Sequence, residues 1–283
     1  MGHDDKTGRR TALAAPADRD GFSSRWESLG SLRLHVRHRP DRNGTTPVVM
    51  LHGLACSHRH LIPTAYALRH HPVLVPDLPG FGLSDKTDVA LDVREHAQVI
   101  AALLDRLALP PVGLLGCSFG AQVAAELTAR RPDLVAALIL VGPTTDPTAA
   151  SVQGQLRRLL LDLVGEDPRQ APILAADIRD AGVRRILATL RHAVRHPMTA
   201  TLSAIDVPTL LVRGSADRIA PEAWLAKAAA LMPGAQRITI DGAAHNAVTT
   251  AGPQLAAAVE AHLSAGTERL RPGPAAPPQR CLE

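Results

Sequence analysis

The most constraining feature of the sequence is its alternation of short apolar runs with longer segments of helical periodicity. Most of the runs are continuous, as in Leu138-Ile139-Leu140-Val141, and predict strands that are buried on both faces. The predicted strands are 31–37, 47–52, 72–76, 111–116, 135–141, 208–213 and 236–240. The predicted helices are 60–70, 91–108, 119–131, 221–232 and 253–264. This order predicts an α/β fold in which right-handed crossovers build a doubly wound, mostly parallel sheet.

The interval 144–205 interrupts this alternation, because it has helical patterns but no predicted strand. In its first part apolar residues recur at helical spacing, from Val152 and Leu156 to Leu163. An insertion of this size between two late strands is too long for an ordinary connection, so it predicts a helical cap over the ends of the sheet. The predicted organisation is a core, a cap and two disordered ends: 23–143 with 206–265, 144–205, and 1–22 with 266–283.

Composition and charge exclude several classes of protein. Hydrophobic residues make up 46% of the chain and charged residues 20%, which is typical of a folded globular protein rather than a disordered one. The net charge of +4 comes from scattered arginines that are not interleaved with aromatic residues, so we expect no nucleic-acid partner. No apolar stretch approaches about 18 residues, so we expect no membrane partner either.

The three cysteines, Cys56, Cys117 and Cys281, are too few and too irregularly spaced for a disulfide framework or a zinc site. They favour a reducing compartment. Because no charged segment with a long apolar run stands at the N-terminus, the expected location is the cytoplasm. The sequence has neither a metal-ligand cluster nor a dinucleotide fingerprint, so we expect a reaction without a cofactor.

The most informative motif is Gly116-Cys117-Ser118-Phe119-Gly120, which follows a predicted strand and opens a predicted helix. A G-x-S-x-G pattern in that setting is typical of a nucleophile elbow, a strained turn that holds the serine hydroxyl at the strand's carboxyl end. The glycines fit because a Cβ at either position would clash with the neighbouring backbone. Ser118 is therefore the candidate nucleophile.

A serine hydroxyl needs a neighbouring base, which here should follow a later strand at the same sheet edge. His245, in a short loop of small residues after strand 236–240, meets this requirement. The imidazole in turn needs a carboxylate to fix its tautomer, and two are available. Asp217 follows strand 208–213, which gives the order serine, acid, histidine, and we favour it. Asp146, just after strand 135–141, is the alternative acid.

The remaining parts of such a site can also be assigned from the sequence. An oxyanion hole needs two backbone N–H groups, and we assign them to Phe119, which follows the nucleophile, and to Leu54, in the loop after strand 47–52. His52 is expected to support that loop rather than to take part in chemistry. Phe81 and Phe119 are the candidates to line an acyl pocket.

These motifs together resemble the α/β-hydrolase superfamily, and the resemblance runs from about residue 28 to 264. The residues that carry it are His52-Gly53, the turn at 77–84, the elbow at 116–120, Gly214 to Asp217, and Gly242 to His245. The chain looks most like the capped bacterial members, which include esterases, carbon–carbon bond hydrolases, lactonases and cofactor-free haloperoxidases. A likeness to the members with an aspartate nucleophile is disfavoured, because position 118 is serine. Many relatives have His where this chain has Cys117, which we expect to be a buried, unreactive thiol.

A Leu-rich helical cap over a serine site predicts a small-molecule substrate with a substantial apolar portion, cleaved as an ester, thioester or related carbonyl compound through an acyl-enzyme. A second hypothesis is that the same triad serves a biosynthetic elimination, cyclisation, acyl transfer or carbon–carbon cleavage. A third hypothesis is that the chain is a ligand receptor with this fold and no enzymatic activity. One further hypothesis is that cap arginines bind a substrate carboxylate or a carrier protein bearing a thioester. The cap arginines are Arg157, Arg158, Arg184, Arg185, Arg191 and Arg195.

Overall fold

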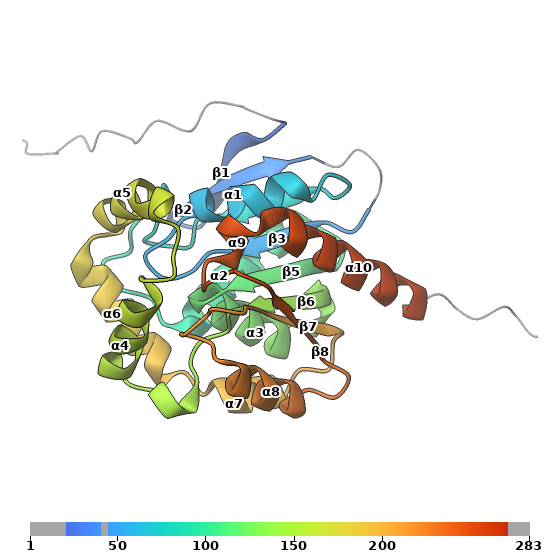
Figure 1. Cartoon of the computed structure of the whole chain (residues 1–283). Helices are drawn as coiled ribbons and strands as arrows, with labels where there is room; N and C mark the ends of the chain where they lie inside the picture. The colour runs from blue at the N-terminus through green and yellow to red at the C-terminus, as the bar shows by residue number, and fades with distance from the viewer. Residues whose placement is uncertain (1–20, 41–44, 271–283) are drawn as a thin grey trace, which may run out of the picture.

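In the computed structural model, which describes residues 21–40 and 45–270, a single eight-stranded sheet forms the centre of the molecule (Figure 1). The strand order is β1-β2-β4-β3-β5-β6-β7-β8. β1 and β2 are antiparallel to their neighbours, and the other adjacent pairs are parallel. The strands are β1 (Ser23–Leu29), β2 (Leu32–Arg39), β3 (Val48–Leu51), β4 (Val73–Pro76), β5 (Val112–Cys117), β6 (Val135–Val141), β7 (Thr209–Gly214) and β8 (Gln236–Ile240). The predicted doubly wound, mostly parallel sheet is confirmed.

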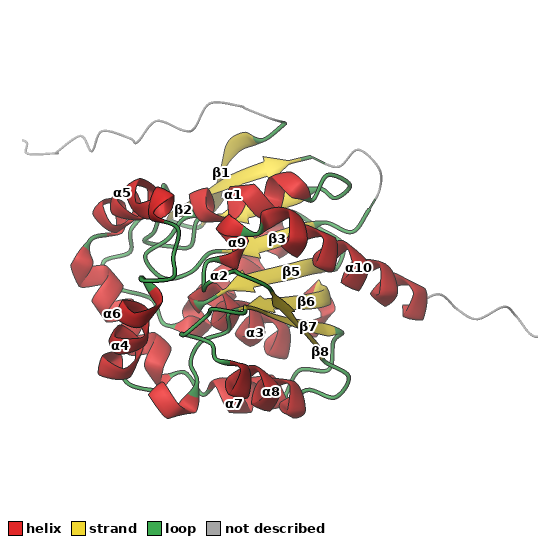
Figure 2. Ribbon diagram, in the orientation of Figure 1, coloured by secondary structure: helices red, strands yellow, loops and turns green. Residues whose placement is uncertain are grey.

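Helices cover both faces of the sheet, as Figure 2 shows. The continuous apolar strands alternate their side chains between two buried clusters: Val49 and Leu51 of β3 enter one cluster, and Val48 and Met50 enter the other. The first cluster includes side chains of α2, α3 and α8, and the second includes side chains of α1, α9 and α10. These helices are α1 (His58–Ala67), α2 (Val93–Arg106), α3 (Phe119–Arg130), α8 (Glu222–Leu231), α9 (Ala247–Thr250) and α10 (Gly252–Leu270).

The segment between β6 and β7 is helical, as the sequence predicts. It contains α4 (Val152–Asp162), α5 (Ala171–Ala181), α6 (Val183–Arg195) and α7 (Met198–Ser203), with short 3-10 turns before α4 and α5. In Figure 1, α4, α5 and α6 lie together beyond one end of the sheet. α7 behaves differently, because Met198 and Leu202 are buried in the cluster beside α3 and α8. It therefore belongs to the layer that covers the sheet, although it falls inside the predicted cap range.

The ends of the described chain differ in detail from the prediction. Phe22, assigned to an N-terminal extension, is 2% exposed and packs in the second cluster. β1 is an additional edge strand that the sequence does not predict, and most of its residues are polar. α10 continues to Leu270, beyond the predicted helix end at 264 and the predicted tail boundary at 266. The rest of the two predicted extensions, 1–20 and 271–283, lies outside the described residues. No helix in the described part of the chain is long and apolar enough to cross a bilayer.

Candidate active site

Ser118 lies at the junction of β5 and α3, in the turn that the glycine pattern predicts. Its backbone has φ 54° and ψ −117°, a strained conformation for a residue with a side chain. A Cβ on Gly116 would lie 2.3 Å from the carbonyl oxygen of Gly120, and one on Gly120 would lie 2.3 Å from that of Leu51. Glycine is therefore required on both sides of the serine, and the turn holds Ser118 at the carboxyl end of β5.

His245 and Asp217, from the loops that follow β8 and β7, form a hydrogen-bonded pair. The Nδ1 atom of His245 is 3.0 Å from Oδ2 of Asp217. The other carboxylate oxygen, Oδ1, accepts hydrogen bonds from the backbone N–H groups of Ile219 and Ala220, each at 2.8 Å. Because Nδ1 is committed to Asp217, Nε2 is the nitrogen that can exchange a proton with another molecule.

The electrostatics of this pair stabilise a charged imidazole next to a charged carboxylate. Burial raises the pKa of Asp217, but His245 and the two backbone donors outweigh burial and hold that pKa below its ordinary value. Burial lowers the pKa of His245, but the carboxylates of Asp217, Asp162 and Glu166 outweigh burial and raise it to about 9. The imidazolium form is therefore favoured in the free enzyme.

Gly142, directly after β6, makes room for the pair. Its φ of 52° is a conformation that favours glycine. A Cβ there would lie 2.8 Å from Cε1 of His245 and 3.1 Å from Oδ2 of Asp217. The imidazole and the carboxylate thus pack directly on backbone, which restricts the orientation of both.

Asp146, the alternative acid, is engaged elsewhere. Its Oδ1 accepts from the backbone N–H of Thr148 at 2.9 Å, and its Oδ2 is 2.6 Å from the Arg158 guanidinium. Burial raises the pKa of Asp146, but the Thr148 and Arg158 donors outweigh burial and lower it. The structure therefore pairs His245 with Asp217 and leaves Asp146 as the N-cap of the turn before α4.

Ser118 and His245 line the same cavity, which has a volume of about 190 Å³. Its walls are mainly apolar, and the inserted helices contribute many of the side chains. Those side chains include Leu156, Leu159, Leu163, Leu174, Ile186 and Leu187. The buried Nε2 of His245 has no hydrogen-bond partner among the described residues, so no hydrogen bond joins it to the Ser118 hydroxyl in this structure. Such contacts are often long before substrate binds and tighten in the complex.

Leu54 and Phe119, the residues predicted to supply the oxyanion hole, both line this cavity next to Ser118. The described part of the chain shows no hydrogen bond from the backbone N–H of either residue. A Cβ on Gly53 would lie 3.3 Å from Cβ of Ser118, so the loop after β3 runs close beside the serine. The loop that carries Leu54 and the first residue of α3 therefore both lie beside Ser118.

His52 supports the same loop through both of its ring nitrogens. Its Nδ1 donates to the carbonyl oxygen of Gly53 at 2.8 Å, and its Nε2 accepts from the backbone N–H of Leu78 at 2.9 Å. Burial lowers the pKa of His52, which suits a neutral imidazole with one donor and one acceptor. The side chain thus ties the loop after β3 to the turn after β4.

Phe81 does not line the cavity, and here the sequence-based assignment needs correction. The ring is 1% exposed, packs edge-on against His52 and lies tilted against His96. It fills the interior behind the loop because the 77–84 turn directs it inward. Phe119 also contacts His96, but it does line the cavity.

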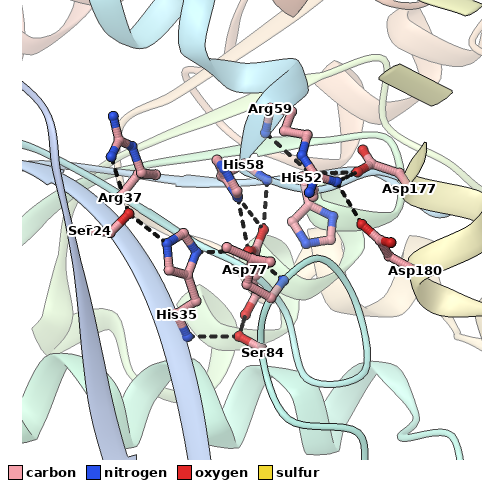
Figure 3. Close-up of polar contacts among 12 residues, drawn as sticks. Ser24, His35, Arg37, His52, His58, Arg59, Asp77, Ser84, Asp177 and Asp180 are labelled. Carbon is pink, nitrogen blue, oxygen red and sulfur yellow. Dashed lines mark hydrogen bonds and ion pairs between the residues drawn. The ribbon is translucent and has the colours of Figure 1, made fainter. Parts of the chain in front are cut away.

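The 77–84 turn is organised by a buried carboxylate, Asp77, seen in Figure 3. The Oδ2 atom of Asp77 lies 2.9 Å from Nδ1 of both His35 and His58. Oδ2 also accepts a hydrogen bond from the backbone N–H of Leu83 at 3.0 Å. The other oxygen, Oδ1, accepts from the backbone N–H of His58 at 2.7 Å. A Cβ on Gly82 would lie 2.3 Å from the Asp77 carboxyl carbon, so this turn also requires glycine. Burial raises the pKa of Asp77, but His58 and His35 outweigh burial and hold it well below its ordinary value.

His35, His58 and Asp77 are also the described residues that group together in the manner of metal ligands, with atoms within 4.8 Å of one another. Each imidazole donates Nδ1–H to Asp77, and Nε2 of His35 is 2.9 Å from Ser24 Oγ (Figure 3). The carboxylate oxygens are occupied by four N–H donors. The donor set is therefore satisfied as a hydrogen-bonded cluster and does not fit a metal without rearrangement.

A second buried cluster joins the inserted segment to α1. Arg59 is ion-paired with Asp177 and Asp180 of α5, as Figure 3 shows, and Ser57 Oγ donates to Asp177 at 2.8 Å. Burial lowers the pKa of the nearby cavity-lining His60, but Cys56 and Asp177 outweigh burial and raise it to about 10. Nε2 of His60 is 3.3 Å from Asp177. His58 and His60 are both buried.

The cap arginines do not reach the cavity, since none of them is among its described lining residues. Arg158 pairs with Asp146 and donates to the carbonyl oxygen of Ile219, and Arg185 binds the backbone of Thr87. Arg157 and Arg184 are exposed. These contacts give no support to a substrate-carboxylate site built from these side chains.

The cysteines among the described residues are free thiols. Burial raises the pKa of Cys117, and Asp217 adds to that effect, so the thiol directly before Ser118 is protonated and unreactive. Cys56 lines the cavity, and burial raises its pKa as well.

Comparison with known proteins identifies the family. A family model described as α/β hydrolase fold matches residues 46–198, more than half of the chain, and a second, described as TAP-like protein, matches residues 189–271. The chain belongs to the α/β-hydrolase family. This α/β hydrolase has the same fold as the enol-lactonase from Burkholderia xenovorans LB400, with a TM-score of 0.72, 19% identity, and coverage of 85% of this chain and 100% of that one.

Curated relatives of this α/β hydrolase include a hydrolase and an esterase. The chain is 26% identical over 261 residues to 2-(acetamidomethylene)succinate hydrolase of Mesorhizobium japonicum, covering 82% of this chain and 92% of the relative. It is 28% identical over 254 residues to pimeloyl-[acyl-carrier protein] methyl ester esterase of Xylella fastidiosa, covering 75% and 93%.

Proposed function

We propose that this α/β hydrolase cleaves esters or thioesters that have an apolar acyl portion, with Ser118 as nucleophile, His245 as general base and Asp217 as its orienting acid. The observation that carries the proposal is the His245 imidazole: Nδ1 is bound to Asp217, and the buried, unpartnered Nε2 belongs to a side chain that lines the same cavity as Ser118. An imidazole held in this way can accept one proton and return it.

In the first half-reaction, Ser118 Oγ bonds to the substrate carbonyl carbon while its proton passes to Nε2 of His245. The carbonyl oxygen becomes an oxyanion, which accepts hydrogen bonds from the N–H groups of Leu54 and Phe119. Such donors are each worth on the order of 10²- to 10³-fold in kcat. The carbon–oxygen or carbon–sulfur bond then breaks, and His245 gives its proton to the leaving group.

In the second half-reaction, water replaces the leaving group. His245 takes a proton from water as the water oxygen bonds to the acyl carbon, and the acyl–serine bond breaks as Ser118 recovers its proton. The products are a carboxylic acid and the regenerated enzyme. Asp217 accepts no proton in either half-reaction; it holds the imidazole and stabilises its cationic form.

The substrate class is inferred from the cavity. Apolar side chains of α4, α5 and α6 form much of its wall, which suits a hydrocarbon acyl chain. The name of the relative pimeloyl-[acyl-carrier protein] methyl ester esterase supports the proposal that the substrate is an ester of an acyl chain. The proposed substrates therefore include acyl groups bound to a carrier protein.

The proposal is tested by pre-steady-state kinetics with p-nitrophenyl butyrate. We expect a burst of p-nitrophenol close to one equivalent per enzyme when deacylation is slower than acylation. We expect Ser118→Ala to show no burst and to lose about 10³-fold or more in kcat. Asp146→Asn is the matched control, because that carboxylate lies outside the triad. Equal turnover by wild type and Ser118→Ala would overturn the proposal.

A further inference from the structure

A turn of the inserted segment is attached directly to the two loops that carry the proposed acid and base. At the end of α4, Oδ1 of Asp162 accepts a hydrogen bond from the backbone N–H of Arg218, at 3.0 Å. Four residues later, Oε1 of Glu166 accepts from the backbone N–H of Asn246, at 2.8 Å. Arg218 directly follows Asp217 in the chain, and Asn246 directly follows His245. One carboxylate is thus anchored beside each member of the pair.

Both carboxylates also line the cavity with Ser118 and His245. Asp162 is only 3% exposed, and its anchor leaves one of its two oxygens without a hydrogen bond among the described residues. Burial raises the pKa of Asp162 to about 6, so the group is ionised at neutral pH. Their charges act on the catalytic imidazole, since both carboxylates raise the pKa of His245.

The positive groups nearby do not neutralise this end of the cavity. No lysine or arginine is found among the described residues that line it, and the side chain of Arg218 is exposed. His60 faces the cavity from α1 but is paired with Asp177, at 3.3 Å. Three carboxylates therefore surround the single cationic imidazole of His245, and they belong to Asp217, Asp162 and Glu166.

We propose that Asp162 and Glu166 form a charge filter in the cavity, which admits neutral and cationic acyl substrates and rejects anionic ones. The inference rests on the proposed function, because it names the substrate class of that same site. A substrate carboxylate within a few ångströms of either group would be repelled in a wall that is otherwise apolar, and even partial screening leaves an effect on the order of tenfold or more in affinity. This sets the chain apart from the relative whose name, 2-(acetamidomethylene)succinate hydrolase, denotes a dicarboxylate.

The filter can be removed without removing its anchors. In Asp162→Asn and Glu166→Gln, the amide oxygen can still accept from the Arg218 or Asn246 N–H. The Oε2 atom of Glu166 also accepts from Nε2 of Gln170, at 3.1 Å; in Glu166→Gln the Gln170 amide can turn to present its unpartnered Oε1 to the new NH2 group, so chiefly the charge changes. Asp167→Asn is the matched control: it lies next to Glu166 and also loses a carboxylate, but Asp167 binds Arg169 and does not line the cavity.

The kinetic test compares kcat/KM at pH 8 for p-nitrophenyl valerate and mono-p-nitrophenyl glutarate, which differ chiefly in a terminal negative charge. We expect wild type to prefer the neutral ester by about tenfold or more beyond the ratio for alkaline hydrolysis in solution. The Asp162→Asn/Glu166→Gln variant should lose most of that preference, and Asp167→Asn should keep it. An unchanged preference in the double variant would overturn the filter while leaving the proposed esterase activity intact.

Binding tests the filter independently of hydrolysis. By calorimetry, hexyltrimethylammonium should bind wild type at least about tenfold more tightly than hexanesulfonate at pH 8, and that ratio should shrink as pH falls through 6, where Asp162 becomes protonated. This measurement needs only the wild-type chain, so it stands if the double variant fails to fold or if no ester is cleaved. Equal affinity for the two ions at pH 8, or a ratio that does not change with pH, would overturn the inference.

Discussion

Asp77 and Asp217 are both buried carboxylates that bind Nδ1 of a histidine. Their surroundings differ, and the difference indicates a structural role for Asp77 and a catalytic role for Asp217. Asp77 is 0% exposed, with two imidazoles and two backbone N–H groups around it, and the far nitrogen of His35 is bound to Ser24. His245, beside Asp217, keeps a far nitrogen that binds no described residue and lines a cavity. A cluster whose polar atoms all have hydrogen-bond partners stabilises a turn, whereas a histidine with one nitrogen left without a partner can transfer a proton.

The largest expected effect concerns the reactive pair. Asp217→Asn keeps a side chain of similar shape but favours the wrong imidazole tautomer, so we expect kcat for p-nitrophenyl butyrate to fall by about 10³- to 10⁴-fold. Asp77→Asn, corrected for the fraction of folded enzyme, should lower kcat much less. Initial rates measured on folded protein, with folding checked by circular dichroism, give this difference in kcat. Similar losses of kcat in both variants would contradict the different roles assigned to Asp217 and Asp77.

Stability should respond in the opposite order. Asp77→Asn leaves donors of buried imidazoles facing an amide and should lower the free energy of unfolding by about 3–5 kcal/mol. Because the folded pKa of Asp77 lies below its unfolded value, its contribution is present above the unfolded pKa and is lost as pH falls through the folded one. Urea titrations at pH 7 would measure the loss; a change below about 1 kcal/mol would contradict the structural role.

The pH profile sharpens the comparison further. The base must be neutral to accept the Ser118 proton, and the carboxylates around His245 raise its pKa to about 9, so kcat/KM should rise as pH increases from 7 toward 9. Asp162→Asn should move this limb to lower pH, because it removes one negative charge near the ring. A profile that is flat above pH 7 in wild type would contradict the assignment.

The smallest effect is expected for the rejected acid. Asp146→Asn should change kcat/KM by less than about threefold, because Asp146 binds Thr148 and Arg158 rather than His245. Parallel assays of Asp146→Asn and Asp217→Asn give the contrast directly. A loss of 10²-fold or more in Asp146→Asn would show that the wrong carboxylate had been chosen.

The comparison also explains what the sequence could predict. The parallel strands and the elbow were predictable because buried strands are continuous apolar runs and because the glycines around Ser118 have no substitute. β1 was missed because its apolar residues are Trp26 and Leu29 alone, and Trp26 lies on the exposed side, so this edge strand lacks that apolar continuity.

The parts of the site that could not be predicted depend on contacts between distant segments. Asp162 ends a helix whose pattern shows only an amphipathic stripe, and its contact with Arg218 spans 56 residues. Phe81 was misassigned because the motif gives its position in the turn but not the direction of its ring. The local signal for this pair is that Asp162 is the last residue of a cap helix and Glu166 follows it four residues later.

The central claim, that Ser118 is the residue activated by His245, is tested most directly by covalent labelling with a fluorophosphonate, followed by peptide mass mapping. We predict one phosphonyl group per chain, located on the peptide that contains Ser118, with labelling strongly slowed in His245→Ala and absent in Ser118→Ala. An unmodified wild-type mass after prolonged exposure, or a label on another residue, would contradict it.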